Sequence, residues 1–299
     1  MENNNKSLLV LSTFILEIIA ILCLILEHFS WMLSDSLGYN YWLVILFEIL
    51  GAVALPLLLF IIAEKLNNGE KAGFIFLFLG IAATGIAITS ILIQYVPIFN
   101  GFSIRAKGNI FIDVLLASLA FYLLSRDKWY FKILSVIPLS VGIVTFFVVS
   151  LEYQNVSLTH WFPYFIRPHY HFYGVLMGIL IYVAHIFKDI FLKQYSNNSG
   201  IPVESLKGTS TERIALNISC AGMIMLETLL LMVFALSIPN EWVYWDIYIQ
   251  NAAIISGAFI LLYNGRVGYN AKWLRYSKLG FYSLHLLIIY LIGLIIINV

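Results

Sequence analysis

Charged residues are scarce in this sequence. Only 11% of its 299 residues are Asp, Glu, Lys or Arg, whereas soluble domains carry about 25%. This scarcity excludes an ordinary soluble domain. The formal net charge of +1 excludes the strongly basic surface that is typical of nucleic-acid-binding proteins, so we expect no nucleic-acid partner.

Cysteine is almost absent as well. The two cysteines, Cys23 and Cys220, both lie in apolar runs, which argues against a disulfide framework and against a thiolate metal site. The N-terminal stretch MENNNKSLLVL lacks the charged region and the small-residue cleavage site of a removable signal peptide. We therefore expect the first apolar run to be retained as a membrane span.

Hydrophobic residues make up 61% of the chain, in stretches long enough to cross a hydrocarbon core of about 30 Å. The predicted fold is an all-α, polytopic membrane helical bundle in one domain, residues 1–299, with the lipid bilayer as its surroundings. About nine spans are expected, at 8–26, 41–63, 72–95, 109–125, 129–151, 170–191, 214–238, 247–263 and 279–297. The polar connection at about 193–211 is expected to be a mobile cytoplasmic loop.

The positive charges predict the orientation. With nine spans, 14 of the 17 Lys and Arg residues fall on one side and three on the other. Cytoplasmic loops keep the excess of Lys and Arg. The sequence therefore predicts a multi-pass protein of the cell membrane with a cytoplasmic N-terminus and an external C-terminus.

Ionisable residues inside the apolar runs are costly and usually face a cavity or a partner. In this topology Glu27, His28, Glu48 and Asp113 fall in the outer half of the membrane, Glu17 and Glu227 fall near its midplane, and His285 falls about a third of the way in from the cytoplasm. Glu17 and His28 are 11 residues apart, which places them on one helix face about 16 Å apart. These spacings predict a polar passage through the outer half of the membrane.

His28 is the best candidate for chemistry, because an imidazole titrates near neutral pH and the adjacent Glu27 could fix its tautomer. The alternative is an interfacial His–Glu pair at a helix end. The external segment between the fifth and sixth spans, THWFPYFIRPHYH, adds His160, His169 and His171. A metal site there is not favoured, because no HExxH or Cys pattern accompanies these histidines.

Several segments, taken in order, resemble the TraX-like family of bacterial membrane acetyltransferases. ILEIIAILCLILEHF and LFEILGAVALPLLLFIIAEKL resemble the family's opening, GNIFIDVLLASLAFYLL its Asn-led fourth span, and RPHYHFYGVLMGILIY a later motif. The clearest match is LLYNGRVG followed by KLGFYSLHLLIIYLI. Four positions depart from the pattern. Glu17 stands where the family has a lysine, and Ala52 where it has an arginine. Glu27 replaces the Asp before the histidine, and His169 or His171 replaces the Asp before the later Tyr-Gly pair.

The resemblance implies an enzyme that moves an acetyl group from cytoplasmic acetyl-CoA to an extracytoplasmic acceptor, either a pilin amine or an envelope glycan, with pilus or envelope-modifying partners. It makes His28 the base, assisted by Glu27. It matches Asn264, Gly265, Arg266 and Gly268 to a cytoplasmic loop motif and His285 to the family's second histidine. We infer that these residues bind the coenzyme, because arginine can hold phosphate groups with two hydrogen bonds. The residues expected to line the acceptor side are Glu17, Glu48, Asn109, Asp113, His169 and His171. Two alternatives stay open: an inactive scaffold of the same fold, and a small-solute or proton-coupled transporter.

Overall fold

The computed structural model describes residues 9–38, 41–100, 102, 108–153, 158, 161–237 and 250–297. Within these ranges the regular structure is helical, apart from a β-bridge between Leu11 and Tyr263. The α-helices are α1 (Thr13–Leu37), α2 (Trp42–Gly51), α3 (Ala54–Asn67), α4 (Ala72–Tyr95), α5 (Ile110–Leu124), α6 (Trp129–Leu134), α7 (Val136–Tyr153), α8 (His171–Ser199), α9 (Val203–Leu206), α10 (Ser210–Ser237), α12 (Ile254–Leu261) and α13 (Lys272–Ile297). Short 3-10 helices lie at η1 (Pro97–Phe99), η2 (Tyr164–Ile166) and η3 (Asn251–Ala253). The all-α prediction is confirmed.

Seven helical stretches in the described part of the chain are long and apolar enough to cross a membrane. They are Thr13–Ser34, Trp42–Asn67, Ala72–Tyr95, Trp129–Glu152, Tyr164–Ser199, Ser210–Ser237 and Tyr276–Ile295. Two shorter apolar helices, Ile110–Leu124 and Asn251–Leu261, lie where the fourth and eighth spans are expected. The outward-facing side chains are apolar too: Leu77 is 62% exposed and Phe147 60%. This surface suits a lipid bilayer.

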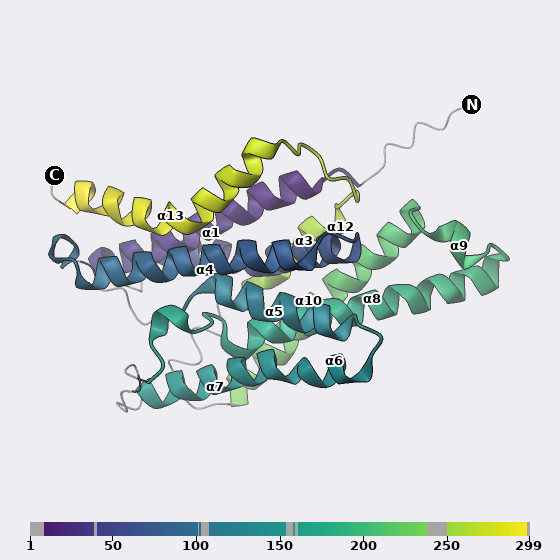
Figure 1. Ribbon diagram of the computed structural model, residues 1–299, viewed down its shortest axis with the longest axis horizontal. Coiled ribbons are helices and arrows are strands. Elements are labelled where there is room, and N and C mark those ends of the chain that lie inside the picture. The colour runs from purple at the N-terminus through teal and green to yellow at the C-terminus, as the bar shows by residue number, and fades with distance from the viewer. Residues whose placement is uncertain are drawn as a thin grey trace.

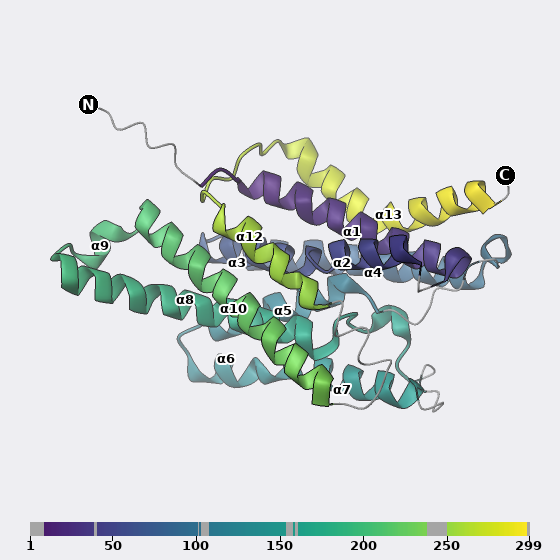
Figure 2. The same cartoon turned by 180° about the vertical axis from the view of Figure 1, so that it is seen from behind.

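The long helices lie side by side along one axis of the molecule (Figures 1 and 2). Helix α1 packs against α2, α3 and α13, while α8 packs against α5, α7 and α10. Glycine permits close approach at several crossings. A Cβ atom on Gly178 of α8, for example, would lie 2.5 Å from the carbonyl oxygen of Ala117 on α5. Small residues at the contact are how helices in lipid come close enough to gain packing energy.

Two of the seven stretches are broken inside the apolar run, and proline explains both breaks. A proline ring clashes with the carbonyl group four residues earlier. Pro56 disfavours helix at Ala52, where α2 gives way to α3, and Pro138 disfavours it at Leu134, where α6 ends. The non-helical residues of the two breaks, Ala52–Val53 and Ser135, therefore lie three to four residues before a proline.

Two expectations about helix ends are wrong. The segment 193–211 is largely helical: α8 continues to Ser199, ends on the left-handed Gly200 (φ +71°), and is followed by α9 and the start of α10. The first helix continues to Leu37 instead of ending near residue 26. Because polar residues are tolerated within these helices, hydropathy underestimated both lengths. Glu27 and His28 consequently lie inside α1, which rules out the helix-end reading of this pair.

Candidate functional site

A pair of buried histidines joins the first and last helices. Nδ1 of His28 on α1 lies 3.0 Å from Nε2 of His285 on α13. The two residues are 0% and 2% exposed. The sequence had placed His28 in the outer half and His285 toward the cytoplasm, with the coenzyme residues. That separation is wrong, because the approach of α1 to α13 brings both rings to one level.

The backbone around the pair fixes its tautomers. His285 Nδ1 lies 3.1 Å from the carbonyl oxygen of Phe281, and His28 Nδ1 lies 3.0 Å from that of Leu24. A carbonyl oxygen only accepts hydrogen bonds, so each Nδ1 carries the proton. His285 Nε2 then accepts from His28 Nδ1–H, and the basic lone pair of His28 lies on its Nε2 atom.

Glu27 contacts Tyr170 and His169, whereas the prediction paired it with His28. Its Oε1 atom accepts a 2.6 Å hydrogen bond from the Tyr170 hydroxyl and lies 3.2 Å from Nε2 of His169. The contacts at His28 Nδ1 come instead from Leu24 and His285. The tautomer-fixing role assigned to Glu27 therefore belongs to the carbonyl oxygen of Leu24, and His285 Nε2 is a second acceptor at the same N–H group.

Trp31, one turn beyond His28 on α1, connects the two halves of this cluster. Its ring centroid lies 4.3 Å from that of His28 and 5.2 Å from that of His169. We call His28, His285, Glu27, His169, Tyr170 and Trp31 the histidine cluster.

Asp113 and Asn109, expected on the acceptor side, hold the segment that carries His169 and Tyr170. The buried Asp113 carboxylate accepts hydrogen bonds from the backbone N–H groups of both residues. Asn109 caps α5 through Phe111 N, and its backbone N–H donates 2.7 Å to the carbonyl oxygen of Arg167, two residues before His169. Both residues thus position the cluster through the backbone.

Glu48 and His171 lie outside these contacts. Glu48 is buried on α2. His171 begins α8 with a left-handed φ of 54°, and its ring faces Phe146. Among the described residues, the hydrogen bonds of the histidine pair are made to Leu24 and Phe281 and within the pair itself.

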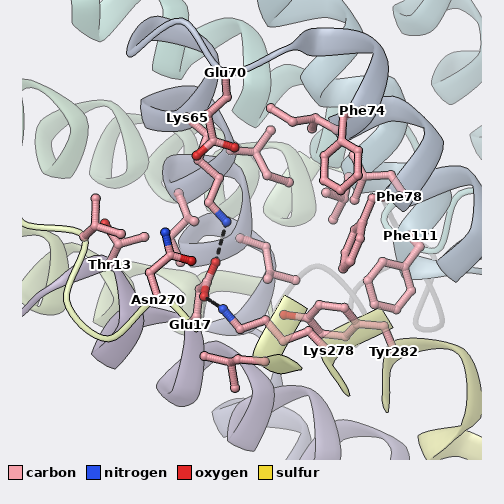
Figure 3. Close-up of a pocket in the computed structure, with 18 of the residues that line it drawn as sticks. Thr13, Glu17, Lys65, Glu70, Phe74, Phe78, Phe111, Asn270, Lys278 and Tyr282 are labelled. Carbon is pink, nitrogen blue, oxygen red and sulfur yellow. Dashed lines mark hydrogen bonds and ion pairs between the residues drawn. The ribbon is translucent and has the colours of Figure 1, made fainter. Parts of the chain in front are cut away.

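Glu17 lies apart from the cluster, about three turns earlier on α1. Its two oxygens bind two lysines, Lys65 of α3 at 2.5 Å and Lys278 of α13 (Figure 3). Both lysines are on the side that the charge distribution predicts to be cytoplasmic. Glu17 is thus ion-paired with lysines of that predicted side, and its assignment to the acceptor side stays a prediction.

A pocket with a cavity volume of about 120 Å³, which opens to the surface, surrounds this ion-paired group. Polar atoms of Thr13, Glu17, Lys65, Asn270 and Lys278 lie on one side, and the rings of Phe74, Phe78, Phe111 and Tyr282 lie on the other (Figure 3). We call it the lysine pocket. Along α13, Lys278, Tyr282 and His285 are spaced i, i+4, i+7, so they share one helix face. The inner wall at Tyr282 thus lies one turn from His285.

The glycine-containing loop after α12 holds the N-terminal segment. Leu11 accepts a hydrogen bond from Asn264 N, and Thr13 N donates to the carbonyl oxygen of Arg266. Gly265 and Gly268 have φ of +76° and +75°, and a Cβ atom on Gly268 would lie 2.5 Å from the Ser12 hydroxyl oxygen. Of residues 264–268, Val267 lines the lysine pocket. The glycines are therefore explained by the shape of the loop.

Among the described residues, no three His, Cys, Asp or Glu side chains are arranged to hold a metal ion. No protein-family model matches the chain, and no curated protein or solved structure is significantly similar to it. The resemblance to the TraX-like family therefore stays a prediction from the motifs.

Several residues of the two sites were missed in the sequence, Trp31 of the histidine cluster among them. Lys65 and Lys278 had been counted only as loop charges, and Tyr170 only as a neighbour of the histidines. The spacing of Lys278 and His285 in KLGFYSLH was the available signal, since it places both on one helix face.

Proposed function

We propose that this protein is a membrane-embedded acyltransferase that moves an acetyl group from cytoplasmic acetyl-CoA to an extracytoplasmic acceptor, a protein amine or a glycan hydroxyl. The observation that carries the proposal is the buried His28–His285 pair with a defined tautomer. A histidine whose proton positions are set by a second group is the arrangement that general-base catalysis requires. The order of the family-like motifs adds support.

The topology belongs to the same proposal. The chain crosses the membrane nine times, with α5 and α12 as the two short spans and with the N-terminus in the cytoplasm. Supporting this orientation, Lys65, Arg213 and Lys278 lie toward the end at which α1 begins, where they pair with Glu64 and Glu17. In this orientation acetyl-CoA enters at the basic, cytoplasmic end, and the acceptor enters from the opposite end, beyond the histidine cluster.

In the proposed reaction His28 Nε2 takes the proton from the acceptor N–H or O–H as that atom attacks the thioester carbonyl. The tetrahedral intermediate then collapses, the C–S bond breaks, and the thiolate leaving group receives the proton from His28. His285 Nε2 accepts from His28 Nδ1–H throughout and so stabilises the imidazolium, as the carboxylate of a catalytic triad does. Glu27, on the neighbouring position of α1, adds negative charge beside it.

Acetyl transfer from radiolabelled acetyl-CoA tests this function. Purified protein in phosphatidylcholine nanodiscs is incubated with an envelope extract, and label in the acceptor fraction is measured. We expect transfer by the wild type and its loss in His28→Ala. Equal transfer by both proteins would eliminate His28 as the base.

One observation favours a second candidate, a proton-coupled transporter. Glu227 on α10 is 1% exposed, and neither carboxylate oxygen has a hydrogen-bond partner among the described residues. Buried carboxyl groups of this kind serve as proton carriers in membrane proteins. A thermal shift with acetyl-CoA but not with acetate favours the enzyme, whereas the absence of any shift favours transport or an inactive scaffold.

A further inference from the structure

The lysine pocket contains two cations that the proposed chemistry leaves without a role. Lys65 and Lys278 both bind the Glu17 carboxylate, and their side chains are 32% and 19% exposed. One carboxylate thus neutralises one of the two charges. Glu70 also lines the pocket but lies exposed at its rim, where water screens it strongly. Around Glu17 itself, the local charge is therefore positive.

The pocket's shape also limits which ligand can fill it. Beyond the two ammonium groups it continues between Phe74, Phe78 and Phe111 to Tyr282 (Figure 3). Seven residues of α13 separate Lys278 from His285, a rise of about 10 Å. A ligand that fills this space has an anionic head at the lysines and a slender chain that extends toward the histidine pair.

We propose that the lysine pocket binds the phosphate end of such an anionic amphiphile, with Lys65 and Lys278 as its ligands and Glu17 as an internal competitor that occupies them in the empty state. Under the proposed function, on which this identification rests, the ligand is acyl-CoA. The arm of coenzyme A between its phosphates and its thioester is a slender chain of amide and methylene groups, longer than the distance to His285 when extended. Phosphate oxygens replace those of Glu17 on both lysines.

A second ligand offers the same anionic head and slender chain: an anionic phospholipid whose phosphate binds the lysines and whose acyl chain lies along the phenylalanines.

A rival location for coenzyme phosphates is the loop at 264–268, where the Arg213 guanidinium lies against Gly265 and is held by Glu64. Neither Arg213 nor Glu64 lines the lysine pocket. These two carboxylates therefore offer matched variants, because each neutralises the cations of one candidate site.

The experiment measures coenzyme A binding by calorimetry to the full chain in phosphatidylcholine nanodiscs. We expect Glu17→Gln to bind severalfold more tightly than the wild type, since the lysines lose their competitor. Lys65→Met and Lys278→Met each weaken binding by at least about tenfold, because each removes a charged hydrogen bond. Glu64→Gln leaves the affinity unchanged. Each lysine variant keeps the other lysine on Glu17, so no buried carboxylate is left unpaired, and thermal unfolding verifies the fold.

Tighter binding by Glu64→Gln but not by Glu17→Gln would overturn the assignment in favour of the loop, as would wild-type affinity in both lysine variants. For the lipid source, the same proteins are purified from nanodiscs containing phosphatidylglycerol. Retention of that lipid by the wild type and its loss in the lysine variants, without coenzyme binding, assigns the pocket to lipid. Retention of neither ligand overturns the proposal.

The result is independent of turnover. Binding as expected without acetyl transfer keeps the site and rejects the acyltransferase, whereas transfer that depends on His28 but not on the lysines keeps the enzyme and rejects the site.

Discussion

His28 and His285 are each buried against a backbone carbonyl oxygen, and this contact decides where their protons lie. With both Nδ1 atoms protonated, His285 presents a lone pair to His28 and holds its ring in place. In the proposed reaction His285 is therefore a positioning residue, whereas His28 is the group that meets the acceptor. A substitution that keeps a hydrogen-bond acceptor should therefore preserve much of the rate of acetyl transfer at position 285 but not at position 28.

We expect His285→Ala to lower the rate of acetyl transfer by about 10²-fold, the lower end of the contribution of a general base. His285→Gln should recover much of that rate, because an amide oxygen can accept the hydrogen bond from His28 Nδ1–H. Initial transfer rates of the two variants make the comparison. If glutamine is no better than alanine at equal thermal stability, His285 does not act through this hydrogen bond.

Tyr170→Phe should destabilise the protein. The Tyr170 hydroxyl donates to the buried Glu27 carboxylate, and a hydrogen bond to a charged group contributes about 1.5–3 kcal/mol. Thermal unfolding in detergent should show a lower midpoint. Tyr95→Phe is the matched control, because the Tyr95 side chain is 69% exposed; equal shifts in the two variants would contradict this account.

At this scale the sequence predicted the important histidines but not their contact. Glu27, His28 and His285 were each singled out because ionisable residues are costly inside apolar runs. The meeting of His28 with His285, 257 positions apart, depends on which helix faces pack together. The sequence likewise singled out Glu17 but did not predict its partners, because Lys65 and Lys278 belong to other helices.

Among the helices, close approach of α2 to α1 shapes the cluster. A Cβ atom on Gly51 would lie 2.5 Å from Cβ of Glu27, so the residue at position 51 controls where Glu27 points. Hydropathy predicted a span here, but it did not distinguish a glycine that permits contact from one that faces lipid.

We expect Gly51→Val to cost about 1–3 kcal/mol through overpacking and to lower acetyl transfer by displacing Glu27. Gly222→Val on α10 is the control, because no atom lies within 4 Å of its added Cβ. The midpoint of thermal unfolding measures the first effect. A Gly51→Val protein as stable as Gly222→Val would show that α2 moves freely against α1.

For the whole molecule, scarce charge and apolar runs of about 20 residues were sufficient to predict an all-α membrane protein. A run of that length matches a helical span, and a helix satisfies its backbone groups within itself. The pairing of α1 with α13 was beyond prediction. In a water-soluble helix the apolar stripe marks the buried face, but here the lipid-facing sides are apolar as well, as Leu22 on α1 and Leu284 on α13 illustrate.

The proposed orientation predicts which loops are accessible from outside. A cysteine replacing the 89% exposed Trp161 should react with a membrane-impermeant maleimide in intact cells. A cysteine replacing Asn198, at the exposed end of α8, should react only after permeabilisation. The native cysteines, Cys23 and Cys220, are buried and give little background. The reverse labelling pattern would invert the topology and place the lysine pocket outside.

The rate of acetyl transfer in the histidine double-mutant cycle tests the central claim most directly. Wild type, His28→Ala, His285→Ala and the double variant are compared in one preparation. If the pair acts as a unit, His28→Ala loses at least about 10²-fold in rate, and the double variant is no slower than His28→Ala alone. Wild-type transfer by His28→Ala, or independent losses that multiply in the double variant, would contradict the account.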